Sequence, residues 1–370
     1  MGEKQPDTKE RLLVFATLLG AFLLVSILAE FALRAAGIFE TYGEANGIGY
    51  YSAYEMWGTR WFQKRSPGHH EKVVPEYTER FFVNEHGFRD RDWPLTKESD
   101  EIRVVTLGGS FVEGVGSTRQ SWSYPSQLSN ILESKFGHRA KILVMNGGVI
   151  GSDPVNNLQA LKRIFYNYQP DLIVQAVDEG DWNVDIPIRG GLDRFNEDGT
   201  VSPGGPWFEP LFEHSHLFRA FILKMLRYKP GILISRSERN RRSNEAVVEI
   251  CKVLEEQSRI AQKLDALLVV EMMFRRSEIV QERRQTDRAL SVKACAMRYA
   301  SVVIDLGEEF LQRFSPEELD QLYWPIDLHF KPAGYKVWAQ IVAAATEPLV
   351  ASRIESLIPS TSKADNLIIL

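Results

Sequence analysis

The chain has 370 residues, of which 44% are hydrophobic and 25% charged, an ordinary balance for a globular protein. Its formal net charge is -5, so no basic excess marks it as a binder of nucleic acid. The length exceeds one average domain but suits a single α/β domain with insertions and appendages, large enough to bury a full hydrophobic core.

An apolar run near the N-terminus predicts a membrane anchor. Residues 12–29 contain no charge and are long enough to cross a bilayer, and residues 31–36 extend the run. A cleaved signal peptide would have a shorter apolar core followed soon by a small-x-small site, whereas the best candidate, Ala35-Ala36-Gly37, lies beyond Glu30 and Arg34. We therefore expect an uncleaved, single-pass transmembrane helix.

The charges that flank this run predict its orientation. Lys4, Lys9 and Arg11 precede it, while only Arg34 closely follows it. Because positive residues favour the cytoplasmic side, residues 1–11 should lie in the cytoplasm. The protein is then expected in the inner or cytoplasmic membrane, with its main domain on the periplasmic or extracellular side.

The two cysteines do not decide the compartment. Cys251 and Cys295 both fall in helix-like patterns of polar and apolar residues. Sequence cannot show whether their Cα atoms lie close enough for a disulfide, which needs a separation of roughly 4.4–6.8 Å. We expect two buried or half-buried free thiols rather than a disulfide, and neither cysteine has the neighbours of a catalytic residue.

Residues 12–36 are assigned to the anchor and residues 37–98 to a juxtamembrane linker and N-terminal extension. As far as about Pro75 this segment is rich in Gly, Tyr and Trp without clear periodicity, which indicates a linker packed loosely on the domain. Its aromatic side chains would suit either the membrane interface or the core. Residues 80–90 then predict a short strand and a turn.

Strands and helices alternate through most of the remaining chain. Apolar, β-branched runs and helical spacing predict strands at 102–107, 141–145, 171–177, 266–272 and 301–305, and helices at 123–136 and 156–168. Such alternation implies right-handed βαβ crossovers. We therefore expect a three-layer α/β/α sandwich around a five-stranded parallel sheet, resembling flavodoxin, over residues 99–355, with a tail at 356–370.

A stretch rich in turn-forming residues, from about 183 to 245, interrupts the alternation. It follows the third strand, so we expect it to form a cap over the carboxyl edge of the sheet, with a helix over 217–226. His214 and His216 lie in it at i and i+2 without a Cys or carboxylate pattern, which is too weak to predict a metal site. We expect neither a metal nor a cofactor.

A candidate nucleophile follows the first core strand. The run Arg103 to Leu107 breaks at Gly108-Gly109-Ser110, with a further glycine at Gly114. Ser110 should therefore lie at the carboxyl end of a strand, where open α/β sheets bind ligands, and the glycines would let backbone N–H groups approach a substrate. The alternative is a tight turn in which Ser110 only caps a helix.

A candidate base lies about two hundred residues further along. A serine hydroxyl needs a base to take its proton, and a carboxylate that fixes the tautomer of that base. Asp327 and His329 offer both roles in the loop before Pro332, which begins a long apolar, helix-like run. Together with the early Gly-Gly-Ser, this pattern favours a functional site over a solvated histidine.

These motifs resemble those of the SGNH/GDSL hydrolase superfamily, in its membrane-anchored bacterial form. The resemblance implies that Ser110 is the nucleophile of the first block, here Gly-Gly-Ser instead of Gly-Asp-Ser. Val144 to Gly151 is similar to the second block, in which Gly151 would supply an oxyanion-hole N–H, and Asp327 and His329 match the last block.

The third block departs from the family pattern. The family has Gly-x-Asn-Asp, whereas this chain reads Asp178-Glu179-Gly180-Asp181, so Gly180 stands where the oxyanion asparagine is expected. Loss of one such donor costs on the order of a hundredfold to a thousandfold in turnover. Three hypotheses remain open: Asn183 or Asn146 reaches the site, the backbone N–H groups of Ser110 and Gly151 suffice, or the site is slow.

The predicted activity is ester hydrolysis by a Ser-His-Asp triad, on an ester-bearing small molecule, an acylated glycan or a lipid at the cell surface. One alternative is a polysaccharide O-acyltransferase that works with a membrane partner in a polysaccharide-modification machinery, because the same residues could pass an acyl group to a sugar hydroxyl. The other is a non-catalytic binding protein on a lapsed hydrolase fold, which Gly180 favours and the retained triad residues oppose.

Overall fold

The computed structural model describes residues 8–36, 65–195, 215–221, 225–226 and 235–357. A five-stranded parallel sheet forms the centre of this part of the chain, in the strand order β4-β3-β5-β6-β7. The strands are β3 (Glu101–Gly108), β4 (Lys141–Gly148), β5 (Leu172–Asp178), β6 (Leu267–Met273) and β7 (Val302–Asp305). Counted from β3, this is the 2-1-3-4-5 order of flavodoxin, so the predicted fold class is confirmed.

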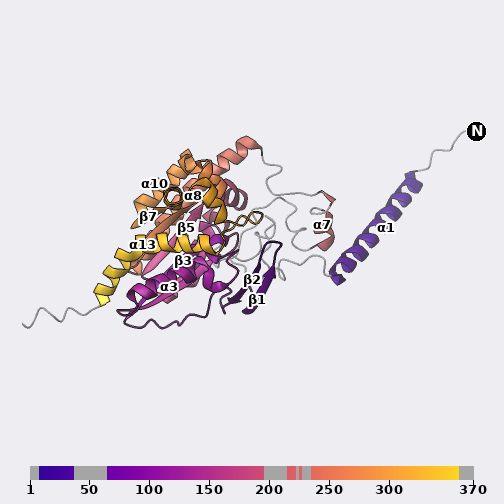
Figure 1. The fold of residues 1–370 in the computed structure, drawn as a ribbon. Coiled ribbons are helices and arrows are strands. Elements are labelled where there is room, and N and C mark those ends of the chain that lie inside the picture. The colour runs from indigo at the N-terminus through magenta and orange to yellow at the C-terminus, as the bar shows by residue number, and fades with distance from the viewer. Residues whose placement is uncertain (1–7, 37–64, 196–214, 222–224, 227–234, 358–370) are drawn as a thin grey trace, which may run out of the picture.

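Helices cover both faces of the sheet and complete the three layers (Figure 1). On one face α3 (Tyr124–Phe136) packs against α13 (Pro332–Leu357). On the other face α8 (Arg236–Lys263) packs against both α4 (Pro154–Arg163) and α10 (Asp287–Tyr299). With helices on both sides, all of β3 is buried, which explains its nearly continuous apolar sequence.

Shorter elements connect these layers. The helix predicted over 156–168 ends earlier than expected, at Arg163, and a separate 3₁₀ turn follows it. The remaining short helices and turns are α2 (Ser110–Glu113), η2 (Gln120–Trp122), η3 (Phe165–Tyr168), η4 (Asp181–Asp185), α5 (Ile186–Arg189), η5 (Leu192–Arg194), α7 (His216–Ala220), α9 (Arg276–Val280), η7 (Arg283–Gln285), α11 (Leu306–Leu311) and α12 (Pro316–Gln321).

An antiparallel hairpin precedes the sheet. Its strands are β1 (Gly68–Val73) and β2 (Thr78–Val83), so the expectation of a linker without regular structure as far as Pro75 was wrong at its end. The strand β1 is polar and mostly exposed, so its sequence lacks the alternation of polar and apolar residues that would predict a strand. Phe81 and Val83 of β2 are buried, and they attach the hairpin to the domain.

A disulfide joins the two helices on one face of the sheet. Cys251 of α8 is bonded to Cys295 of α10, with the Cα atoms 5.5 Å apart, so the expectation of free thiols was wrong. The helix pattern of each cysteine was read correctly from sequence. What the sequence did not contain is the relative rotation of α8 and α10, which pack together and turn both thiols toward the same seam.

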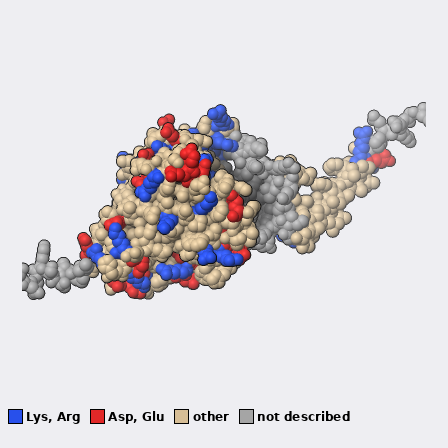
Figure 2. All heavy atoms as spheres, viewed as in Figure 1, with Lys and Arg blue, Asp and Glu red and all other residues tan. Residues whose placement is uncertain are grey.

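The N-terminal helix α1 (Thr8–Ala35) is long and apolar enough to cross a membrane, a property that a signal sequence shares. Its apolar side chains are exposed along its length, and Figure 2 shows basic and acidic residues together near its N-terminal end. Near its other end, the Glu30 carboxylate accepts the N–H groups of His216 and Leu217 and the Ser215 hydroxyl. The helix α1 therefore contacts α7, the beginning of the helix predicted over 217–226.

Candidate active site

Ser110 lies where β3 gives way to α2, at the carboxyl edge of the sheet. Two glycines allow this turn. A Cβ on Gly108 would come within 2.4 Å of the Val112 side chain, and one on Gly109 would come within 3.2 Å of the Ser152 carbonyl oxygen. Gly108 leaves room for Val112 of α2, and Gly109 lets the loop after β4 lie close to the residue before Ser110.

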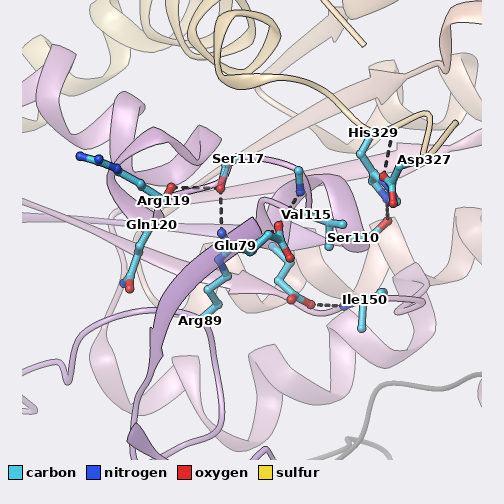
Figure 3. Close-up of polar contacts among 12 residues, drawn as sticks. Glu79, Arg89, Ser110, Val115, Ser117, Arg119, Gln120, Ile150, Asp327 and His329 are labelled. Carbon is cyan, nitrogen blue, oxygen red and sulfur yellow. Dashed lines mark hydrogen bonds and ion pairs between the residues drawn. The ribbon is translucent and has the colours of Figure 1, made fainter. Parts of the chain in front are cut away.

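His329 lies over Ser110, with Asp327 beside it (Figure 3). Its Nε2 is 2.7 Å from the Ser110 Oγ, and its Nδ1 is 2.5 Å from the Asp327 Oδ1. The structure thus brings together three predicted residues from segments more than two hundred positions apart. Their order, carboxylate to imidazole to hydroxyl, is the arrangement that activates a serine.

The hydrogen bonds fix the state of the imidazole. Burial alone would raise the pKa of Asp327, but the hydrogen bond and charge of His329 outweigh it and hold the pKa of Asp327 below its ordinary value. An ionised Asp327 can only accept, so the Nδ1 of His329 carries a proton. In the neutral ring, Nε2 is then the acceptor that faces the Ser110 hydroxyl.

Contacts from the N-terminal hairpin hold this loop in place. The Glu76 carboxylate, in the turn between β1 and β2, accepts the N–H groups of Ile326 and Asp327 at 3.0 and 2.6 Å. The Trp324 indole donates to the Gly116 carbonyl oxygen at 2.9 Å. Between Asp327 and His329, Leu328 has a φ of 67°, a left-handed conformation that a leucine adopts only under constraint.

The second block lies against the first. The Glu113 carboxylate accepts the Ile150 N–H at 2.5 Å, and Gly151 has a φ of 67°. Arg189 donates to the Gly151 carbonyl oxygen at 2.5 Å, which orients that peptide. Among the hydrogen bonds of the described residues, none uses the Gly151 N–H, and the Ser110 N–H begins a helix, where N–H groups have no partner within the helix.

In the third block, the Asp178 carboxylate lies next to Gly180, the position at which the family pattern has an asparagine. The Asp178 Oδ1 accepts the Gly180 N–H at 2.6 Å, and a Cβ on Gly180 would lie 2.7 Å from that oxygen. Asp181 turns back and accepts the Asp178 N–H at 2.8 Å. Burial, with the nearby charges of Asp178 and Asp185, raises the pKa of Asp181 well above its ordinary value.

The two asparagines considered as replacement donors have other partners. The Asn183 side chain donates to Glu179 at 2.8 Å and accepts from Arg288 at 3.2 Å. The Asn146 side chain is buried, and its amide donates to the carbonyl oxygens of Arg89 and Glu113. The Asn146 amide thus uses both of its N–H donors away from Ser110, and the Asn183 amide uses one, so neither hydrogen-bond set supports the hypothesis that one of them reaches the site.

Sequence reasoning missed the residues that position the site. Glu76 and Arg189 act across long separations in the chain, and no local pattern marks them. Glu113 did carry a signal, because a charged residue inside the apolar stretch that follows Ser110 has to find a buried partner.

No protein-family model matches this chain, and no curated protein matches it. Among solved structures, a family 3 carbohydrate esterase of Clostridium thermocellum is 12% identical with a TM-score of 0.42, over 69% of this chain and 99% of that chain. A lipase/acylhydrolase from Enterococcus faecalis is 13% identical with a TM-score of 0.39, over 67% and 96%.

A two-domain esterase active on acetylated mannans is 12% identical, also with a TM-score of 0.39. This match covers 69% of the present chain but only 50% of that longer one. Overall likeness at this level decides nothing about activity, so a functional conclusion has to come from the geometry of the site itself.

Proposed function

We propose that this protein is an ester hydrolase of the SGNH type, with Ser110 as nucleophile, His329 as general base and acid, and Asp327 as the residue that orients His329. One observation carries the proposal: a continuous hydrogen-bonded path from Asp327 through His329 to Ser110. Such a path raises the reactivity of a serine that is otherwise a weak nucleophile. A structural serine cap would need neither the histidine nor the aspartate.

The reaction runs in two halves. The Ser110 Oγ attacks the ester carbonyl carbon while His329 Nε2 takes the hydroxyl proton, and the carbonyl electron pair moves onto oxygen. Collapse of this intermediate expels the alcohol, which receives the proton from His329, and leaves an acylated Ser110. Water, deprotonated by His329, then attacks the acyl carbon; the bond to the Ser110 Oγ breaks, His329 returns the proton to that oxygen, and the carboxylic acid leaves.

Backbone donors next to Ser110 supply the core of the oxyanion hole. The N–H groups of Ser110 and Gly151 both lie at the carboxyl edge of the sheet, and Arg189 and Glu113 hold the second-block loop that carries Gly151. Donors fixed in advance stabilise the developing charge without a cost of reorganisation. The departure at Gly180 therefore leaves the two backbone donors in place.

We propose acylated glycans or lipids at the outer side of a cytoplasmic membrane as the substrate class. Two features support this location: α1 is apolar enough to span a bilayer, and the chain carries a disulfide, which persists in oxidising compartments. The three positive residues before the apolar run favour a cytoplasmic N-terminus, with the domain of residues 99–355 outside.

The test is hydrolysis of p-nitrophenyl acetate and acetylated oligosaccharides by the full-length protein in detergent, beside Ser110→Ala. We expect turnover in the wild type and at least a thousandfold loss in the variant, roughly the effect of losing a serine nucleophile. Equal release of p-nitrophenol by the two proteins would refute the mechanism. Acetyl transfer to an added methyl glycoside in place of water would instead identify an O-acyltransferase.

A further inference from the structure

Arg275 follows the strand next to the third block. Asp178 and Met273 pair at the ends of β5 and β6, and Gly180 and Arg275 each lie two residues beyond these strand ends. The side chain turns toward that glycine, and the Arg275 Nη2 lies 3.5 Å from the position that a Cβ on Gly180 would occupy. A guanidinium therefore borders the space that a side chain at position 180 would enter.

Nearby carboxylates attract the guanidinium of Arg275, but they do not occupy its hydrogen-bond donors. It is exposed, and no described residue forms a hydrogen bond to it or an ion pair within 4.0 Å. The carboxylates of Asp178, Glu278 and Asp185 nevertheless lie close enough to attract it. Its N–H donors thus remain available to a ligand, whereas the adjacent Arg276 forms an ion pair with Asp320.

Ser110 and Arg275 follow the carboxyl ends of β3 and β6, which lie at the same edge of the sheet. The strands β3, β5 and β6 are consecutive in the sheet, so β6 lies about 10 Å from β3, two strand spacings away. The Asp178 carboxylate spans part of that distance. One of its oxygens lies against Gly180, and the other is 4.0 Å from the Cβ position of Gly109, the residue before Ser110.

We propose that Arg275 is a catalytic residue that donates a hydrogen bond to the ester oxygen as it becomes an oxyanion, in place of the side-chain donor that position 180 lacks. This inference rests on the proposed function. A cation at the sheet edge stabilises the charge that forms when Ser110 attacks, and it keeps its own protons throughout. The surrounding carboxylates hold it beside Gly180 at a distance that leaves its donors unoccupied.

The experiment compares Arg275→Ala, Arg275→Lys and the neighbouring control Arg276→Ala in the full-length protein, with p-nitrophenyl acetate as substrate. For Arg275→Ala we expect kcat to fall about a hundredfold with KM nearly unchanged, the signature of a donor used in the transition state. Millimolar guanidinium chloride should restore part of that rate, and Arg275→Lys should lie between the wild type and Arg275→Ala. Arg276→Ala should match the wild type.

Each other outcome overturns the inference. If Arg275→Ala has the same kcat as Arg276→Ala, the residue has no catalytic role. If only KM rises, or if neither guanidinium nor the lysine of Arg275→Lys restores kcat, its role is in binding or structure. Thermal unfolding shows whether each variant is folded, and Arg275→Gln provides a second variant. Labelling of Ser110 in the wild type by a p-nitrophenyl phosphonate separates the two proposals, since absence of label refutes the hydrolase itself.

Discussion

Asp327 and His329 belong to one strained stretch of backbone. Leu328 between them has a φ of 67°, and its side chain is exposed, so packing of that side chain does not cause the conformation. The turn instead brings the Asp327 carboxylate back to the imidazole two residues later, at 2.5 Å. Strain of this kind persists only where neighbouring contacts impose it, here those of Glu76.

Replacing the carboxylate tests the role of Asp327. In Asp327→Asn an amide that can donate would no longer require a proton on His329 Nδ1, so Nε2 would often carry the proton and fail as a base. We expect kcat for p-nitrophenyl acetate to fall by a factor on the order of a thousand or more, with the fold unchanged. Asp320→Asn, which alters a surface pair with Arg276, should leave kcat unaffected; equal losses in both would contradict the assignment.

At the scale of elements, the hairpin of β1 and β2 contacts the loop that carries His329. Glu76 connects its turn to the N–H groups of Ile326 and Asp327. Glu76→Ala should therefore lower kcat about ten- to a hundredfold, because small displacements of a reacting group are costly. The matched control is Glu71→Ala, which removes only an exposed ion pair with Arg80 on the same hairpin. A loss common to both variants would show that the hairpin as a whole, and not Glu76, is responsible.

The buried Glu271 joins β6 to the helix layer made by α3 and α13. It accepts hydrogen bonds from the Tyr124 hydroxyl and, at 3.1 Å, from the Trp338 indole. Burial raises the pKa of Glu271 from 4.5 to about 8, against the lowering effect of these two donors. The native protein therefore holds a proton that the unfolded chain has lost at neutral pH.

This difference makes stability depend on pH in a stated direction. The contribution is complete below pH 4.5 and is lost as pH rises to about 8, so the free energy of unfolding should fall by about 1.4 kcal/mol per pH unit across that window. Glu271→Gln, which cannot ionise, should show a flatter profile in urea denaturation at pH 5, 6, 7 and 8. Parallel profiles for the two proteins would mean that Glu271 titrates normally in the native state.

For the whole molecule, the disulfide links α8 and α10, two helices on the same face of the sheet. It spans 44 residues of sequence, and in the chain-entropy account closing such a loop contributes about 4 kcal/mol to stability. The paired variant Cys251→Ser with Cys295→Ser should lower the midpoint of urea denaturation accordingly. Dithiothreitol should reproduce this shift in the wild type and change nothing in the variant, whereas an unchanged midpoint in the variant would contradict the estimate.

Features that depend on local sequence patterns could be predicted, whereas features that depend on contacts between distant segments could not. Strand ends were predictable, because apolar runs stop at turn residues, and parallel topology brings the carboxyl ends to one edge. That reasoning placed Ser110 at the correct edge, and the His329 loop was found by chemical pairing. The strand β1, the disulfide partner of Cys251 and the position of Arg275 depend on rotations and registers between distant elements, which local patterns do not encode.

The contact between Glu30 and α7 determines which part of the chain lies next to the C-terminal end of α1. Glu30, near the C-terminal end of α1, accepts hydrogen bonds from three groups of α7, so these two helices are held together as one unit. If α1 spans a bilayer, α7 would therefore be held close to the lipid surface at the C-terminal end of α1. A hydrolase tethered in this way would meet membrane-bound substrates by diffusion in the plane of the bilayer.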